Sequence, residues 1–173
     1  MSFCQYDSNI TCPYDSYRVP TRSAIAVIKG SAQYPDINGT VYFERAPKGT
    51  NVMVRLSGLP EYKMATATSP QIGPHGFHIH SGGSCVAGPA TNPFPNTDGH
   101  FNPTNQPHGN QSGDFSAIFS NHGVSRISFY TDKFFPEDII GKTVVIHLSP
   151  DDYKTQPAGG SGLQIACGVI KKA

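Results

Sequence analysis

The sequence predicts an all-β fold, either a sandwich or a barrel, and three observations lead to this prediction. Glycine and proline are frequent, with 18 and 15 of the 173 residues, and they divide the chain into short segments. The segments between them are rich in valine, isoleucine, phenylalanine and tyrosine, which strands favour. No segment combines a sustained helical period with capping residues. Many short strands separated by Gly/Pro turns are typical of sandwiches and barrels.

About eight segments have the composition of strands. The third of them, residues 51–56, alternates apolar and polar side chains with the period of a half-buried strand. Asn38-Gly39 is a turn signal before the second, and Asn121-His122-Gly123 predicts a hairpin turn between the fifth and the sixth. The predicted strands are residues 24–29, 40–44, 51–56, 76–80, 115–119, 126–130, 143–148 and 163–170.

Two long connections interrupt this series of short predicted strands, at residues 81–113 and 149–162. Loops of this length inside a compact domain are usually functional or disordered. The first loop carries Cys85, His100 and His108, which argues against disorder. We therefore expect one domain over residues 23–173 with two long functional loops. Residues 1–22, which contain Cys4 and Cys12, are expected to form an irregular leader or an edge strand.

Composition excludes several classes of protein. The formal net charge is +1 and charged residues make up 14% of the chain, so there is no electrostatic footprint for nucleic acid. No apolar run approaches the ~20 residues that a membrane span needs. The first residues lack the basic and apolar regions of a signal peptide, which predicts a cytoplasmic protein. In that compartment cysteines are generally free thiols or metal ligands rather than disulfides.

Four of the seven histidines lie in three short motifs that predict a metal site. His78 and His80 lie two residues apart on a predicted strand and therefore share a face. His100 follows in the first long loop, and His147 lies in a later apolar strand. Four imidazoles suit Cu(II). The alternative is a chance histidine pair plus a hydrogen-bonded core histidine at 147. The combination favours a metal, because burying several unpartnered imidazoles is costly.

A second group, His100, His108 and Asp114, has donors that suit zinc. The simpler alternative is that His108 is a solvated turn residue and Asp114 a turn cap. On spacing alone this alternative is favoured.

The motifs taken together resemble the copper/zinc superoxide dismutase family, in that family's order and with similar gaps, over roughly residues 23–172. The resemblance implies an eight-stranded Greek-key β-barrel, usually a homodimer, with an active site outside the barrel under the two long loops. The motifs are residues 76–80, 99–103, 108–109, 113–114, 141–147 and 166–170.

The resemblance also implies roles for individual residues. Copper ligands would be His78, His80, His100 and His147. His100 would also bind zinc as a bridging imidazolate, with His108 and Asp114 as further zinc ligands. Asp151 would hydrogen-bond one ligand histidine of each metal and so fix their orientation. Cys85 and Cys167 would form a disulfide, an exception to the cytoplasmic rule. The chain-entropy model assigns a bridge of this loop length roughly 4–5 kcal/mol.

The chain departs from the family pattern at two site positions. Gln111 stands where the family has a zinc-binding histidine, and an amide is a poor zinc donor. Zinc is therefore expected to be held by three protein ligands and water, to be weakly held, or to be absent, and Gln111 is kept as a candidate fourth zinc ligand. Gln164 stands where the family has an arginine at the mouth of the copper channel. Without that charge we expect slower turnover and weaker salt dependence.

The expected activity is dismutation of superoxide by one-electron cycling of histidine-bound copper, with zinc supporting the bridging histidine. Superoxide is the expected substrate, and no partner beyond a second copy of the chain is implied. A copper-only dismutase and a non-catalytic copper-binding relative are the alternatives.

Overall fold

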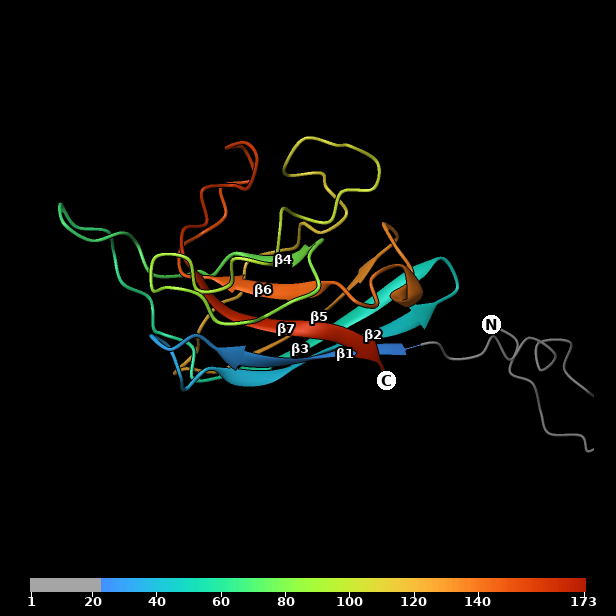
Figure 1. The fold of residues 1–173 in the computed structure, drawn as a ribbon, viewed down its shortest axis with the longest axis horizontal. Helices are drawn as coiled ribbons and strands as arrows, with labels where there is room; N and C mark the ends of the chain where they lie inside the picture. The colour runs from blue at the N-terminus through green and yellow to red at the C-terminus, as the bar shows by residue number, and fades with distance from the viewer. Residues whose placement is uncertain (1–22) are drawn as a thin grey trace, which may run out of the picture.

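The computed structural model describes residues 23–173, which form one antiparallel sheet that curls on itself (Figure 1). The leader predicted for residues 1–22, with Cys4 and Cys12, lies outside the described residues, so the boundary at residue 22 stays a prediction. The strands are β1 (Ser23–Gly30), β2 (Asn38–Ala46), β3 (Gly49–Ser57), β4 (Phe77–His80), β5 (Ser125–Thr131), β6 (Thr143–His147) and β7 (Gln164–Lys172).

The order of strands in the sheet is β4-β6-β7-β1-β2-β3-β5. The first three strands form a meander, in which β2 and β3 meet at a tight turn that pairs Ala46 with Gly49. β4 and β5 lie at opposite edges of this order, so the chain crosses over between β3 and β4 and again between β4 and β5. The second crossing contains the first long loop. It rises beside the loop that joins β6 to β7, and both stand over β4 and β6 (Figure 1).

Burial along the strands explains where a site can form. In β1, Ala24, Ala26 and Ile28 are buried and the residues between them are not, as expected for one face on the core and one in solvent. By contrast, every residue of β4 and β6 is buried. Phe77 and Ile79 of β4 belong to the apolar core, so alternation places His78 and His80 on the outer face, under the long loops.

The all-β prediction is confirmed, but the count of eight strands is not. The predicted strand at residues 115–119 makes only one isolated bridge, between Ile118 and His75. The reason lies in the second long loop: the Tyr153 hydroxyl accepts a hydrogen bond from the Ala117 N–H (2.9 Å) and donates one to the Phe115 carbonyl (3.3 Å). A side chain thus uses two backbone groups that a strand ladder would need.

Helical structure is minimal. The 3₁₀ turn η2 (Pro136–Asp138) follows β5, and no helix within residues 23–173 has the length and apolar character to cross a membrane.

Candidate metal centre

Four histidines from two strands and one loop converge over the outer face of β4 and β6. His78 and His80 come from β4, His147 ends β6, and His100 is brought to His80 by an isolated bridge. One ring nitrogen from each of the four lies within 4.8 Å of the others, and all four residues are buried. The His78 and His100 rings are stacked, with centroids 4.0 Å apart. The structure therefore brings together all four residues that the sequence predicted as copper ligands.

The hydrogen bonds of these rings leave one nitrogen of each ring facing the others. His80 Nδ1 donates to the Asp98 carbonyl (2.7 Å), and His147 Nδ1 donates to the Gly162 carbonyl (3.1 Å). The Nε2 atoms of His80 and His147 then face each other at 3.3 Å as lone pairs. His78 Nδ1 and His100 Nε2 are buried and have no hydrogen-bond partner among the described residues.

Such an arrangement fits a cation. Buried polar atoms without partners cost free energy, and opposed lone pairs repel, so a metal ion at this point relieves both. Four neutral imidazole nitrogens are the donor set that Cu(II) prefers. The chemistry of the donors and their hydrogen bonds therefore fit copper.

The second group is formed by His100, His108 and Asp114, whose donor atoms also lie within 4.8 Å of one another. Asp114 Oδ1 is 2.9 Å from His100 Nδ1 and 3.2 Å from His108 Nδ1. Two imidazoles and a carboxylate suit zinc. His100 presents Nε2 to the first group and Nδ1 to the second, so one ring lies between the two. The structure does not support a solvated turn residue at position 108, because His108 is buried.

Asp151, from the loop after β6, connects the two groups. Its Oδ2 accepts a hydrogen bond from His78 Nε2 (2.7 Å) and its Oδ1 accepts one from His108 Nε2 (2.9 Å). The Tyr153 N–H also donates to Oδ1 (2.7 Å). Gly159 leaves room for this carboxylate, because a Cβ there would lie 1.8 Å from Oδ1. These bonds fix which nitrogen of each ring remains available.

Burial sets the charge of these groups. It lowers the pKa of His80 to about 3, with a contribution from nearby His100, and it lowers the pKa of His147 well below its ordinary value. Burial also lowers the pKa of His78, although the hydrogen bond to Asp151 opposes the shift. These rings are thus neutral at pH 7, the form that binds metals.

For the carboxylates of Asp151 and Asp114, hydrogen bonds oppose the effect that burial has on the pKa. Burial alone would raise the pKa of Asp151, but hydrogen bonds from His78 and His108 outweigh it and hold the pKa below its ordinary value. Burial alone would also raise the pKa of Asp114. Hydrogen bonds from His100 and from two backbone N–H groups help to lower it below its ordinary value. Both are therefore anionic at neutral pH.

The remaining predicted residues also lie around these groups. Cys85 and Cys167 form a disulfide that ties the first long loop to β7, so the disulfide that the resemblance implied is confirmed. Gln164 pairs with His147 across β6 and β7, and its Nε2 donates to Thr97 Oγ1 (3.0 Å). Gln111 is buried three residues before Asp114.

Sequence reasoning missed several residues that hold the site in place. Asp98 and Gly162 offer backbone carbonyls to ligand rings, which no side-chain motif signals. Fully buried His75 places its ring nitrogens 3.0 Å from the His147 carbonyl and 3.1 Å from the Pro60 carbonyl, beneath the site. Its position directly before the histidine motif on β4 was the one available signal.

Comparison with known proteins agrees with this geometry. The model of the family described as copper/zinc superoxide dismutase matches residues 37–170. A Cu-Zn superoxide dismutase of Deinococcus radiodurans is 35% identical over 155 residues, covering 78% of each chain. One from Legionella pneumophila is 33% identical over 141 residues (77% of each), and superoxide dismutase [Cu-Zn] A of Xenopus laevis is 31% identical over 163 residues (85% of this chain and 95% of the relative). This chain belongs to the copper/zinc superoxide dismutase family.

Proposed function

We propose that this protein is a superoxide dismutase that converts superoxide and protons to dioxygen and hydrogen peroxide. The observation that carries the proposal is the convergence of four buried imidazoles, each with one nitrogen free of backbone or carboxylate partners, in a member of this family. His78, His80, His100 and His147 would hold copper, and His100, His108 and Asp114 would hold zinc. Copper bound there supplies a one-electron couple that oxidises one superoxide anion and reduces the next.

The protein's own residues orient the ligand rings and deliver a proton. The Asp98 and Gly162 carbonyls and the Asp151 carboxylate each hold one ring nitrogen, so His80, His147 and His78 keep a fixed tautomer. His100 is the proposed proton carrier. Its Nδ1 lies 2.9 Å from Asp114, and its buried Nε2 has no hydrogen-bond partner among the described residues, so Nε2 would take up a proton whenever it does not hold copper and would donate that proton to peroxide.

The approach of superoxide would be governed by Gln164. Its half-buried side chain lies beside His147 in the sheet and is held by Thr97. An amide can donate a hydrogen bond to an anion but does not attract it over a distance. We therefore infer that substrate capture depends little on long-range electrostatic steering.

A metal-content measurement coupled to a superoxide assay tests the proposal. The full chain is loaded with copper and zinc, its metals are quantified, and the decay of superoxide is followed. The wild-type chain should bind about one copper per four-histidine group and remove superoxide rapidly. His147→Ala should abolish the activity while the disulfide and the β circular dichroism signal remain. Full activity in that variant would refute the copper assignment.

Two alternatives remain tied to specific observations. The zinc group has only three donors of the usual kind, which favours a copper-only dismutase. An uncharged Gln164 favours a copper-binding relative without catalysis. Zinc content separates the first alternative from the proposal, and superoxide decay at full copper occupancy separates the second.

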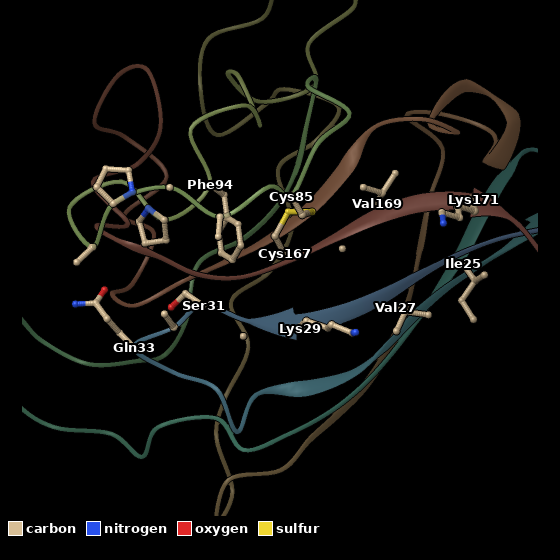
Figure 2. Close-up of a pocket in the computed structure, with 18 residues that line it drawn as sticks. Ile25, Val27, Lys29, Ser31, Gln33, Cys85, Phe94, Cys167, Val169 and Lys171 are labelled. Atoms are coloured by element: carbon tan, nitrogen blue, oxygen red, sulfur yellow. A yellow bond between two sulfur atoms is a disulfide. The ribbon is translucent and has the colours of Figure 1, made fainter.

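We also propose a homodimer, with a second copy covering an apolar surface on β1 and β7. Figure 2 shows Ile25 and Val27 of β1 and Val169 of β7 near the Cys85–Cys167 disulfide. These residues line a hollow of about 530 Å³. Val27 is 57% exposed, and together with Ile25 and Val169 it makes this face apolar, a feature of interaction sites.

Sedimentation measures this assembly directly. The wild-type chain should sediment as a dimer, Val27→Glu should shift it towards monomer, and Val124→Glu, at an exposed apolar residue before β5, should not. A monomeric wild-type chain would refute the dimer. Cytoplasmic residence stays a prediction, and cell fractionation tests it.

A further inference from the structure

Gln111 has an unusual environment for a glutamine in a loop. Gln111 is only 8% exposed, and its side-chain oxygen Oε1 is buried without any hydrogen-bond partner among the described residues. A buried amide oxygen that forms no bond costs free energy, so native structures rarely leave one unused. The same condition is found at His78 Nδ1, His100 Nε2 and His108 Nδ1, which all belong to the two metal groups.

The backbone ties Gln111 closely to the zinc group. The Gln111 N–H donates to Asp114 Oδ2 (2.9 Å), and the Asp114 N–H donates back to the Gln111 carbonyl (3.2 Å). Asp114 Oδ1, the other oxygen of this carboxylate, faces His100 and His108. Lys133 Nζ also donates to the Gln111 carbonyl (3.1 Å), which further restrains the turn. The turn that carries Gln111 is thus held by the same carboxylate that would bind zinc.

We propose that Gln111 Oε1 is the fourth protein ligand of the zinc group, an inference that rests on the function proposed above. Zinc takes four ligands in structural sites, and His100, His108 and Asp114 supply three. An oxygen that is already buried and unpaired needs no dehydration when the ion arrives. Because an amide oxygen is neutral, this ligand set holds zinc less tightly than one with a carboxylate at position 111.

Zinc affinity at a copper-loaded site tests the ligand. The full chain is first loaded with one equivalent of copper(I), which is silent in visible absorption, and then titrated with zinc against a chromophoric chelator. Gln111→Ala should weaken zinc binding by about tenfold to a hundredfold. Gln111→Glu should tighten it by about tenfold, since it places a charged oxygen at the same point. Asn110→Ala, at the exposed neighbouring residue, should leave the affinity unchanged.

Cobalt(II) in place of zinc gives a second readout. The visible bands of cobalt(II) depend on its donor set and coordination number, so their position and intensity should change in Gln111→Ala, where water replaces the amide. Equal zinc affinity and an equal cobalt spectrum in the wild-type chain, Gln111→Ala and Gln111→Glu would overturn the proposal, as would a wild-type chain that takes up no zinc. The superoxide assay on the same copper-loaded protein is read separately. An inactive protein overturns the dismutase function, while the zinc comparison still decides the ligand.

Discussion

The two metal groups are built on different kinds of backbone. Three of the four residues in the copper group lie on β4 and β6, where ladder hydrogen bonds join β4 to β6 and β6 to β7. In the zinc group, His100, His108 and Asp114 all lie in the crossing between β4 and β5. One half of the site is thus carried by the sheet, and the other by a loop.

The loop half depends on contacts from elsewhere in the chain. Asp151 holds His108, Tyr153 attaches the second loop to the segment after Asp114, and the disulfide fixes the start of the first loop to β7. Each of these contacts joins residues far apart in sequence. The comparison teaches that loss of these loop contacts should release zinc before copper. The disulfide and Asp151 predictions below test this, and the acid and Gln164 predictions probe the copper group itself.

Acid should act first on the copper group, and this is the largest expected effect. The folded-state pKa of His80 is about 3, below its unfolded value near 6.5, so the unfolded chain binds more protons between these pH values. The stability of the metal-free protein is therefore full above pH 6.5 and is lost as the pH falls towards 3, by roughly 5 kcal/mol from His80 alone. Urea unfolding at a series of pH values measures this loss.

The carboxylates of Asp114 and Asp151 contribute to stability in a lower pH range. Because the pKa values of Asp114 and Asp151 are lowered from 3.8, their contribution is lost only below that pH. His80→Ala should reduce the loss of stability between pH 6.5 and 3, with His78 and His147 still contributing, whereas His122→Ala, at a fully exposed ring, should leave the loss unchanged. Constant stability of the metal-free chain from pH 7 to pH 4 would contradict this prediction.

Loss of the disulfide should have the next largest effect. Cys85 and Cys167 are separated by 82 residues, and the chain-entropy model gives such a bridge about 4.5 kcal/mol. The double variant Cys85→Ser/Cys167→Ser should lose about that much unfolding free energy in urea. It should also lose zinc at a lower chelator concentration than copper, because Cys85 anchors the loop that carries His100 and His108. Equal loss of both metals would argue against a loop-borne zinc group.

Asp151→Asn should separate the two halves more selectively. An amide accepts hydrogen bonds only through its oxygen, so it cannot accept from both His78 and His108. Zinc affinity should fall by about tenfold to a hundredfold, and copper affinity should fall less, because His78 is held on β4. Competition titrations measure each metal, with Asp152→Asn, at the exposed neighbouring carboxylate, as the control. A larger fall for copper than for zinc would reverse the comparison.

The smallest effect concerns access to the copper group. Gln164→Arg should raise the rate constant for superoxide severalfold at low ionic strength. Salt should reduce the gain, because at 0.1 M the attraction is largely screened beyond a Debye length of ~10 Å. The wild-type rate should depend weakly on salt. Thr68→Arg adds the same charge at an exposed residue of the loop between β3 and β4, which contributes no residue to either metal group, and should change little. A wild-type rate that falls steeply with salt would show that another cation steers the substrate.

The strand-borne half of the site is also the half that sequence periodicity describes best. The spacing of His78 and His80 follows from the two-residue period of a strand, and β4 has that geometry. The other predicted strands also appear, except at residues 115–119. There the residue pattern suits a strand, but the Tyr153 hydroxyl forms hydrogen bonds with the Ala117 N–H and the Phe115 carbonyl.

The loop-borne half was located by motif resemblance and not by periodicity. Spacing alone favoured a solvated His108, and only the fold shows it buried against Asp151. The carbonyls of Asp98 and Gly162 leave no trace in the sequence, because any residue supplies a carbonyl and only the fold decides where it points. Such contacts depend on tertiary structure between distant segments, which local pattern does not encode.

Anomalous diffraction from crystals of the chain loaded with copper and zinc, measured on either side of each metal's absorption edge, tests the two-group account most directly. We predict a copper peak among His78 Nδ1 and the Nε2 atoms of His80, His100 and His147, and a separate zinc peak beside His108 and Asp114, with the His100 ring between them. A copper peak away from the four rings, or a single peak shared by both metals, would contradict it.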